Sequence, residues 1–269
     1  MTSALDAADW QADLDLIADA SRKAGAVALS FFGQSPEVWW KQEGRSPVSA
    51  ADYAANTTLE DMLRAARPGY GWLSEETDDD PARLDCETVF VVDPIDGTRG
   101  FIAGLKTWCV SVAVVHKGRP VAGCLVAPAL EEEFLARADG PALKNGAALV
   151  VSELSPHVRL RIAAAEDTLH GFSPDKRSRI ERVAHVPSLA YRIAMVADGT
   201  IDGTLVKRNS HDWDLAAADL ILERAGGGLV DLEGQALIYN RAKVSHGVLC
   251  AANTALPDLL KSLIASGRG

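Results

Sequence analysis

The sequence predicts a layered protein in which an α+β half, residues 1–145, is followed by an α/β half, residues 146–269. Two observations predict this fold class. The first half opens with apolar residues at helical spacing and then changes to continuous apolar runs of strand length. The second half alternates strand-like and helix-like segments. With 269 residues, of which 48% are hydrophobic, the chain is long enough to bury a large core.

The first half is expected to begin with two amphipathic helices. Apolar residues recur at helical spacing from Trp10 to Phe31, and Gly33 supplies a C-terminal stop. A second helix is expected over residues 49–66, with Ser49 as its N-cap. The strands expected after it are 89–92, 108–115 and 121–127.

The second half is expected to alternate between strands and helices. Asn145-Gly146, ahead of the β-branched pair Val150-Val151, is a hairpin signal at its start. The expected strands are 160–164, 201–207, 229–231 and 247–251. The expected helices are 188–197, 213–225 and 256–265, and Gly226 stops the second of them.

The composition excludes several classes of function. A formal charge of −10 argues against nucleic-acid binding, which needs a broad basic face. No apolar run approaches the roughly 20 residues that a membrane span requires. The first residues are acidic rather than basic and precede no apolar run, so we expect no secretory signal. The four cysteines stand far apart, which favours reduced thiols and a cytoplasmic location.

Candidate chemistry begins at Asp93, where an apolar strand ends abruptly. Asp93 and Asp96 are two carboxylates three residues apart, which can converge on one small volume. Pro94 restricts the backbone, and Gly97 permits a tight turn with close approach of a ligand. Carboxylates without His or Cys favour Mg²⁺ or Mn²⁺ over zinc. The alternative is that both aspartates only cap a turn.

Three further acidic positions strengthen the metal hypothesis. Asp52 lies in the first turn of the second expected helix, Glu75 ends an apolar approach, and Asp214 opens a later helix. Taken singly, Asp52 and Asp214 are typical of helix N-termini, where acids are favoured. A cluster of such carboxylates would repel strongly unless cations were bound between them.

Four strings, taken in order, resemble the motifs of one enzyme family. They are Ser46-Pro47-Val48-Ser49-Ala50-Ala51-Asp52, Leu73-Ser74-Glu75-Glu76, Val92-Asp93-Pro94-Ile95-Asp96-Gly97-Thr98 and Trp213-Asp214-Leu215-Ala216-Ala217, with Ala225-Gly226-Gly227 beyond. Their order and separations are similar to those of the inositol monophosphatase superfamily. The resemblance implies the layered αβαβα fold of the sugar phosphatases and lithium-sensitive, Mg²⁺-dependent hydrolysis of a phosphate ester.

The resemblance also implies two to three Mg²⁺ ions, for which Mn²⁺ could substitute. One would be held by Glu75, Asp93 and the carbonyl of Ile95. A second would be held by Asp93, Asp96 and Asp214, and a third, looser ion would use Glu75 with waters. No covalent phosphoenzyme is expected.

The same resemblance implies the catalytic and substrate roles. Thr98, with Asp52 or Glu75, would orient and deprotonate the attacking water, and the backbone N–H groups of Gly97 and Thr98 would hold phosphate oxygens. The substrate contacts expected are Gly97, Thr98, Ser188, Lys207 and Asp214, with Tyr191 and Arg192 as further candidates for the pocket lining. His211, beside a helix start, is expected to be a structural donor rather than a general acid.

Lys207 bears on which phosphate ester is cleaved. Inositol-specific members of the family place a Glu there to accept bonds from ring hydroxyls. A lysine cannot accept them, but it can neutralise a second phosphate. The first two strings look closest to bacterial 3′(2′),5′-bisphosphate nucleotidases, and Arg99 resembles a basic residue of nucleotidase and histidinol-phosphatase relatives. Gly100 departs from the nucleotidase pattern, which commonly has an acidic residue at that position.

We therefore expect a small phosphorylated metabolite as substrate, first of all adenosine 3′,5′-bisphosphate, cleaved to AMP and phosphate. Inositol 1-phosphate, histidinol phosphate or a sugar phosphate are the alternatives, and Lys207 would then lie on a solvated loop edge. A different class of function is a non-catalytic regulator that keeps the same fold and acts through a partner. Relatives include monomers and dimers, so a homodimer is a further possibility.

Overall fold

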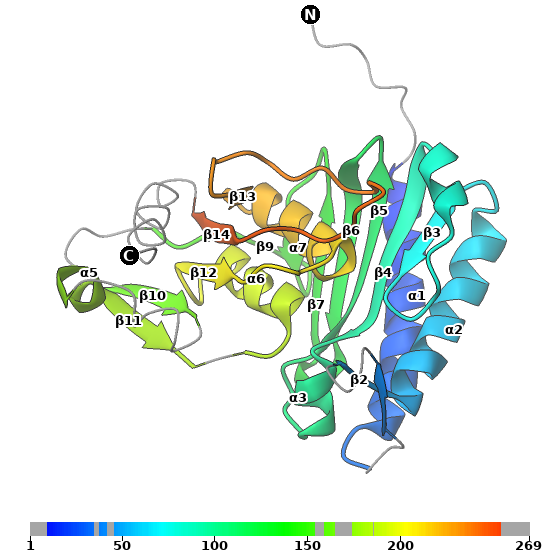
Figure 1. Cartoon of the computed structure of the whole chain (residues 1–269), viewed down its shortest axis with the longest axis horizontal. Helices are drawn as coiled ribbons and strands as arrows, with labels where there is room; N and C mark the ends of the chain where they lie inside the picture. Colours follow the sequence, from blue (N-terminus) through cyan, green and yellow to red (C-terminus); the bar gives the residue numbers. More distant parts are fainter. Residues whose placement is uncertain are drawn as a thin grey trace, which may run out of the picture.

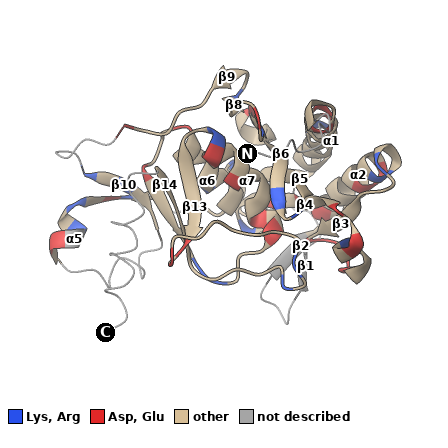
Figure 2. Cartoon of the chain, turned by 90° about the horizontal axis from the view of Figure 1, so that it is seen from above, with Lys and Arg blue, Asp and Glu red and all other residues tan. Residues whose placement is uncertain are grey.

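The computed structural model describes residues 10–34, 38–41, 46–153, 159–164, 174–184 and 186–253. Two long helices, α1 (Trp10–Phe31) and α2 (Ala50–Ala66), pack together on one face of a seven-stranded sheet. On its other face lie α6 (Leu189–Ala197) and α7 (Asp212–Arg224), which also contact a second, five-stranded sheet (Figure 1). Seen from above, these elements form successive layers (Figure 2). The last helix predicted from the sequence, 256–265, lies outside the described residues.

The large sheet contains seven strands in chain order. They are β3 (Gly71–Ser74), β4 (Thr88–Asp96), β5 (Cys109–His116), β6 (Arg119–Ala127), β7 (Glu132–Arg137), β8 (Leu143–Lys144) and β9 (Ala147–Ala148). β3 runs parallel to β4, and all later neighbours are antiparallel. The strands predicted near 89–92, 108–115 and 121–127 are thus present, and β4 continues beyond its prediction to Asp96.

The sequence prediction differs from the large sheet in three places. β3 was not predicted as a strand, although all four of its residues are buried. β7 was not predicted, although Phe134 and Ala136 are buried at alternating positions of the strand. The hairpin at Asn145-Gly146 is present, with positive φ at both residues, but its second strand is Ala147–Ala148 rather than Val150-Val151. Two-residue turns with positive φ join antiparallel strands most readily, which is why this signal was informative.

The small sheet has the order β11-β10-β12-β14-β13. Its strands are β10 (Leu160–Ala163), β11 (Ile180–Val183), β12 (Gly203–Val206), β13 (Gly227–Asp231) and β14 (Leu249–Asn253). Pairing is parallel from β11 through β12 and antiparallel around β14. Four of these strands were predicted; β11 was not.

Six short elements complete the described fold. They are the β1 (Val38–Lys41) and β2 (Ser46–Ser49) pair, the 3₁₀ turns η2 (Pro81–Asp85) and η3 (Pro128–Leu130), and the short helices α3 (Thr98–Ile102) and α5 (Pro174–Ser178). The predicted boundary near residue 145 stays a prediction.

Helix α7 lies between the two sheets. Because it packs against a sheet on each side, it is apolar on both of these faces. Every residue from Leu215 to Ala218 is buried, as are Leu220, Ile221 and Leu222. A Cβ added to Gly123 of β6 would lie 3.0 Å from the carbonyl oxygen of Ala217, so the strand and helix backbones approach closely. This packing fixes the start of α7, which carries Asp214.

Within the described part of the chain, the helices are all too short or too polar to span a bilayer. The four cysteines are free thiols, three of them buried and Cys86 half-buried. This agrees with the reduced state expected from their spacing.

Candidate active site

A bulge in β4 turns two aspartates toward the same side of the large sheet. Asp93 pairs with Ser111 and Asp96 with Cys109, so a step of three residues along β4 lies opposite a step of two residues along β5. Residues three apart in a regular strand point to opposite faces, and one extra residue restores the same face. The apolar residues of β4 agree: Val91 packs toward α6 and α7, whereas Ile95 packs toward α1 and α2. The bulge at Pro94-Ile95 is therefore what brings the two carboxylates together.

Asp93 lies at the centre of an acidic cluster. Its Oδ1 accepts a hydrogen bond from the Ile95 backbone N–H at 3.0 Å, whereas its buried Oδ2 has no partner among the described residues. Ligand oxygens of Glu75, Asp93 and Asp214 all lie within 4.8 Å of one another. Burial raises the pKa of Asp93 well above its usual value, and the negative charges of Glu75 and Asp96 raise it further.

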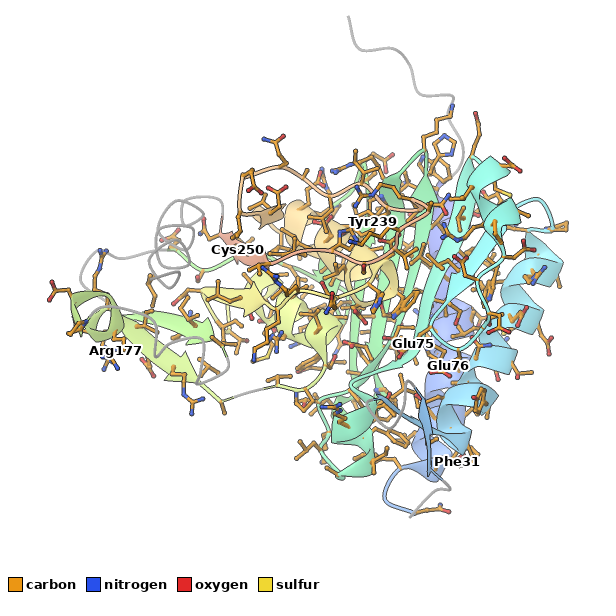
Figure 3. All side chains as sticks on the ribbon, in the orientation of Figure 1. Phe31, Glu75, Glu76, Arg177, Tyr239 and Cys250 are labelled. Carbon is orange, nitrogen blue, oxygen red and sulfur yellow. The ribbon has the colours of Figure 1, made fainter. Side chains whose placement is uncertain are left out.

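Glu75 reaches this cluster because β3 runs beside β4. The strands pair in parallel up to Ser74 opposite Val92, and the Glu75 N–H donates to the Val92 carbonyl at 3.2 Å. Glu75 thus leaves β3 next to Asp93. Figure 3 shows Glu75 and Glu76 side by side just past the end of β3.

Asp52 and Thr98 meet beside the cluster. Thr98 Oγ1 lies 3.1 Å from Oδ1 of Asp52 and 3.0 Å from the Ile95 carbonyl oxygen, either of which can accept its hydrogen. Asp52 Oδ2 accepts bonds from both the backbone N–H and the hydroxyl of Ser49. Asp52 is only 1% exposed, and burial raises its pKa. Ser49 thus fixes the carboxylate, in addition to the N-cap position expected for it.

Asp96 is turned toward the start of α6. Its Oδ2 accepts bonds from the Ser188 hydroxyl at 2.5 Å and from the Ala190 N–H at 2.6 Å. Burial raises the pKa of Asp96 to about 6 despite these bonds. Asp96 is accordingly absent from the group of converging ligand oxygens, although its charge acts on both Asp93 and Asp214.

Gly97 is required by this contact with α6. Its φ is +93°, in the left-handed region that favours glycine, and an added Cβ would lie 2.9 Å from Cβ of Ser188. The sequence predicted a close approach of ligand at Gly97, and the structure shows a close approach of Ser188. Ser188 itself is fully buried and binds Asp96 and the Tyr191 N–H, so its hydroxyl orients Asp96.

Asp214 is held at the start of α7. Its Oδ2 accepts the His211 N–H at 2.7 Å, as expected for an acid in a first helical turn. Burial, followed by the charge of Asp96, raises the pKa of Asp214 to about 8. The His211 ring stacks on Trp213 with centroids 4.7 Å apart. His211 is not among the residues that line the adjacent cavity, and its role as a structural donor stays a prediction.

A cavity of about 560 Å³ opens beside Asp96 and Asp214. Its apolar wall is formed by Pro187, Leu189, Leu205 and Val206, and its polar lining also includes Asn209 and Ser210. Four basic side chains line it: Arg99, Arg192, Lys207 and Arg208. Sequence reasoning had singled out Arg99, Arg192 and Lys207, although it placed Arg192 in the pocket without a role. It missed Ser210, for which only its position between Lys207 and Asp214 was a signal.

The residues present fit a divalent cation. A buried carboxylate oxygen without a hydrogen bond, as at Asp93, costs free energy unless a cation or a proton satisfies it. The converging ligands are carboxylate oxygens only, the donors that Mg²⁺ prefers. The Ile95 carbonyl lies against Thr98 at the edge of the same group. Which residues bind which ion stays a prediction.

Comparisons with known proteins agree with this geometry. The inositol monophosphatase family model matches residues 9–267. An inositol-1-monophosphatase of Mesorhizobium japonicum is 32% identical over 87% of this chain and 91% of its own. A 3′-phosphoadenosine 5′-phosphate phosphatase of Mycobacterium leprae is 32% identical over 95% of this chain and 96% of its own. The crystal structure of the extragenic suppressor protein SuhB of Bartonella henselae superposes with a TM-score of 0.82, at 27% identity, over 94% of this chain and 98% of that one.

Proposed function

The chain belongs to the inositol monophosphatase family and is a phosphatase, and from this premise we propose a Mg²⁺-dependent phosphomonoesterase that uses water as its nucleophile. The observation that carries the proposal is the buried, unpartnered Oδ2 of Asp93 at the centre of the carboxylate cluster. Glu75, Asp93, Asp214 and the Ile95 carbonyl would hold the ions, with Asp96 joining through its second oxygen. When bound, Mg²⁺ supplies charge neutralisation of the phosphoryl oxygens and acidifies water.

Thr98 and Asp52 are suited to orient and deprotonate that water. When the Thr98 hydroxyl donates to Asp52 Oδ1, its lone pairs remain to accept a hydrogen from the nucleophile. Burial raises the pKa of Asp52 above its usual value, which makes a carboxylate a better proton acceptor. The bonds from Ser49 hold its other oxygen in place. The backbone N–H groups of Gly97 and Thr98 would bind phosphate oxygens.

The cavity bears on the alcohol that is released. Its four basic side chains suit a substrate with a second anionic group, and they disfavour histidinol phosphate, whose alcohol carries an ammonium group. The apolar wall offers a surface for a flat base. We therefore propose a 3′(2′),5′-bisphosphate nucleotide as the substrate, with Lys207 neutralising the second phosphate. A cytoplasmic location and a possible homodimer are further parts of the proposal.

A comparison of kcat/KM for adenosine 3′,5′-bisphosphate, inositol 1-phosphate and histidinol phosphate with Mg²⁺ tests the substrate. We expect the bisphosphate to be preferred, and a Lys207→Glu variant to lose at least about tenfold on the bisphosphate. Preference for inositol 1-phosphate would refute the nucleotide assignment. Absence of Mg²⁺-dependent phosphate release from all three would instead favour a non-catalytic regulator on this fold.

A further inference from the structure

One of the basic side chains that line the cavity beside the carboxylate cluster is buried. Arg99, Lys207 and Arg208 are exposed at its rim, whereas Arg192 is only 8% exposed. Arg192 projects from α6, the helix whose first turn binds Asp96. A guanidinium at that depth is removed from water and needs partners for its N–H groups.

The structure satisfies the Arg192 guanidinium incompletely. Nη1 donates to the Val186 carbonyl at 3.1 Å, but the buried Nε has no hydrogen-bond partner in the described part of the chain. The nearby Asp96 carboxylate attracts the guanidinium by its charge, but it forms no hydrogen bond with Nε. Leaving a charged donor unpaired is costly, so the site favours an acceptor supplied from outside the chain.

Ser210 repeats the pattern in the same cavity. It is 6% exposed, lies at the end of the loop after β12, and its buried Oγ likewise finds no partner among the residues described. Two buried hydrogen-bond donors from separate elements, α6 and the β12–α7 loop, therefore line one cavity. An oxyanion offers several acceptor oxygens and one or more negative charges, which match both donors at once.

We propose that Arg192 Nε and Ser210 Oγ form a subsite for the second, non-scissile phosphate of a bisphosphate substrate, and so determine specificity. This inference rests on the proposed function, in which a first phosphate lies at the carboxylate cluster. It assigns the buried part of the recognition to Arg192 and Ser210, and leaves Lys207 and Arg208 as rim charges. A planar guanidinium binds phosphate oxygens directionally, whereas a solvated lysine acts as a point charge.

Two substrates that differ only in the second phosphate test the subsite. Adenosine 3′,5′-bisphosphate and adenosine 3′-monophosphate are compared with wild type, Arg192→Gln and Ser210→Ala. We expect the ratio of kcat/KM for the bisphosphate to kcat/KM for the monophosphate to fall at least about tenfold in Arg192→Gln, mainly through KM for the bisphosphate. Ser210→Ala should show a smaller loss of the same kind. Arg64→Gln, an exposed change on α2, serves as the matched control.

Equal losses on both substrates would overturn the proposal, because a structural role for Arg192 through Asp96 affects every substrate alike. Equal kcat/KM for the two substrates in wild type would overturn it as well. If Arg192→Gln does not fold, Ser210→Ala carries the same comparison.

A binding measurement separates this inference from the proposed function. AMP carries only the phosphate assigned to the subsite, so calorimetry in EDTA should show binding to wild type that is weakened at least about tenfold in Arg192→Gln. Failure of hydrolysis with intact, Arg192-dependent AMP binding would refute the proposed function alone. If the bisphosphate is hydrolysed but AMP binds equally well to wild type, Arg192→Gln and Ser210→Ala, the subsite alone is refuted.

Discussion

Replacing Asp93 by Asn changes one oxygen of the cluster into an amide and should have opposite effects with and without metal. In EDTA, Asp93 is a buried acid whose pKa is raised by burial and by the charges of Glu75 and Asp96. Removing it relieves that repulsion, so Asp93→Asn should be more stable than wild type. With Mg²⁺ present the order should reverse, because the variant lacks the central anionic ligand.

The structure sets the size of both effects. Two ionised carboxylates with oxygens at most 4.8 Å apart repel by about 3 kcal/mol or more at an effective dielectric constant near 20. Protonation of the cluster limits this cost, so a gain of about 1–3 kcal/mol is expected for the variant in EDTA. Mg²⁺ at a hundred times its Kd should stabilise wild type by about 2.7 kcal/mol, which raises Tm by roughly 5–10 °C for a chain of this size.

Thermal unfolding of both proteins across a Mg²⁺ titration measures these effects without any substrate. Asp61→Asn, an exposed change on α2, is the control and should respond to Mg²⁺ like wild type. Phosphate release provides the second readout, and the variant should lose nearly all activity. An Asp93→Asn protein with wild-type Mg²⁺ stabilisation, or with wild-type activity, would refute the assignment of Asp93 as the central ligand.

Two further predictions concern Asp219 of α7 and Gly97 ahead of α3. Burial raises the pKa of Asp219 to about 7, above an unfolded value near 4, so its contribution to stability is greatest below about pH 4 and falls by about 4 kcal/mol as the pH rises through 7. Asp219→Asn keeps an acceptor for the Tyr239 hydroxyl and removes this dependence on pH. The free energy of unfolding, measured in urea, should therefore rise for the variant relative to wild type between pH 5 and 8. A difference that stays constant with pH would contradict this. Gly97→Ala should cost at least about 2 kcal/mol and lower kcat, since its Cβ meets Ser188, whereas Gly33→Ala, with positive φ but open space, should cost about 1 kcal/mol and leave kcat unchanged.

The sequence was most informative where chemistry and local structure coincide. Asp52 and Asp214 lie in the first turns of helices and Asp93 lies in β4, as the sequence indicated, whereas β3, which ends just before Glu75, was not predicted. Their convergence follows from the parallel pairing of β3 with β4 and from α7 packing across the large sheet. Order and spacing of the motifs predicted that outcome only through the family resemblance.

Other features of the site depend on contacts that the sequence does not encode locally. The β4 bulge appears only in the register with β5, and it decides which way Asp96 points. Asp96 then binds the start of α6, more than 90 residues later in the chain. For Arg192 a local signal did exist, since a single arginine interrupts an otherwise apolar α6, but only the cavity shows what that arginine faces.

Helix α6 contacts both Asp96 and the cavity, and so would link the proposed reaction centre to substrate recognition. Its first turn fixes Asp96 through the Ser188 hydroxyl and the Ala190 N–H, and Arg192, half a turn further on, lines the cavity. The Ser188 hydroxyl and one backbone N–H form these bonds, so Arg192 can be replaced without removing a hydrogen bond to Asp96. Relatives of this chain are named as phosphatases of different phosphate esters. A fold that keeps its carboxylates in place while the cavity residues vary would account for this. Replacing the cavity residues of α6 and of the β12–α7 loop should consequently alter KM for the phosphate ester, whereas the dependence of activity on Mg²⁺ should stay unchanged.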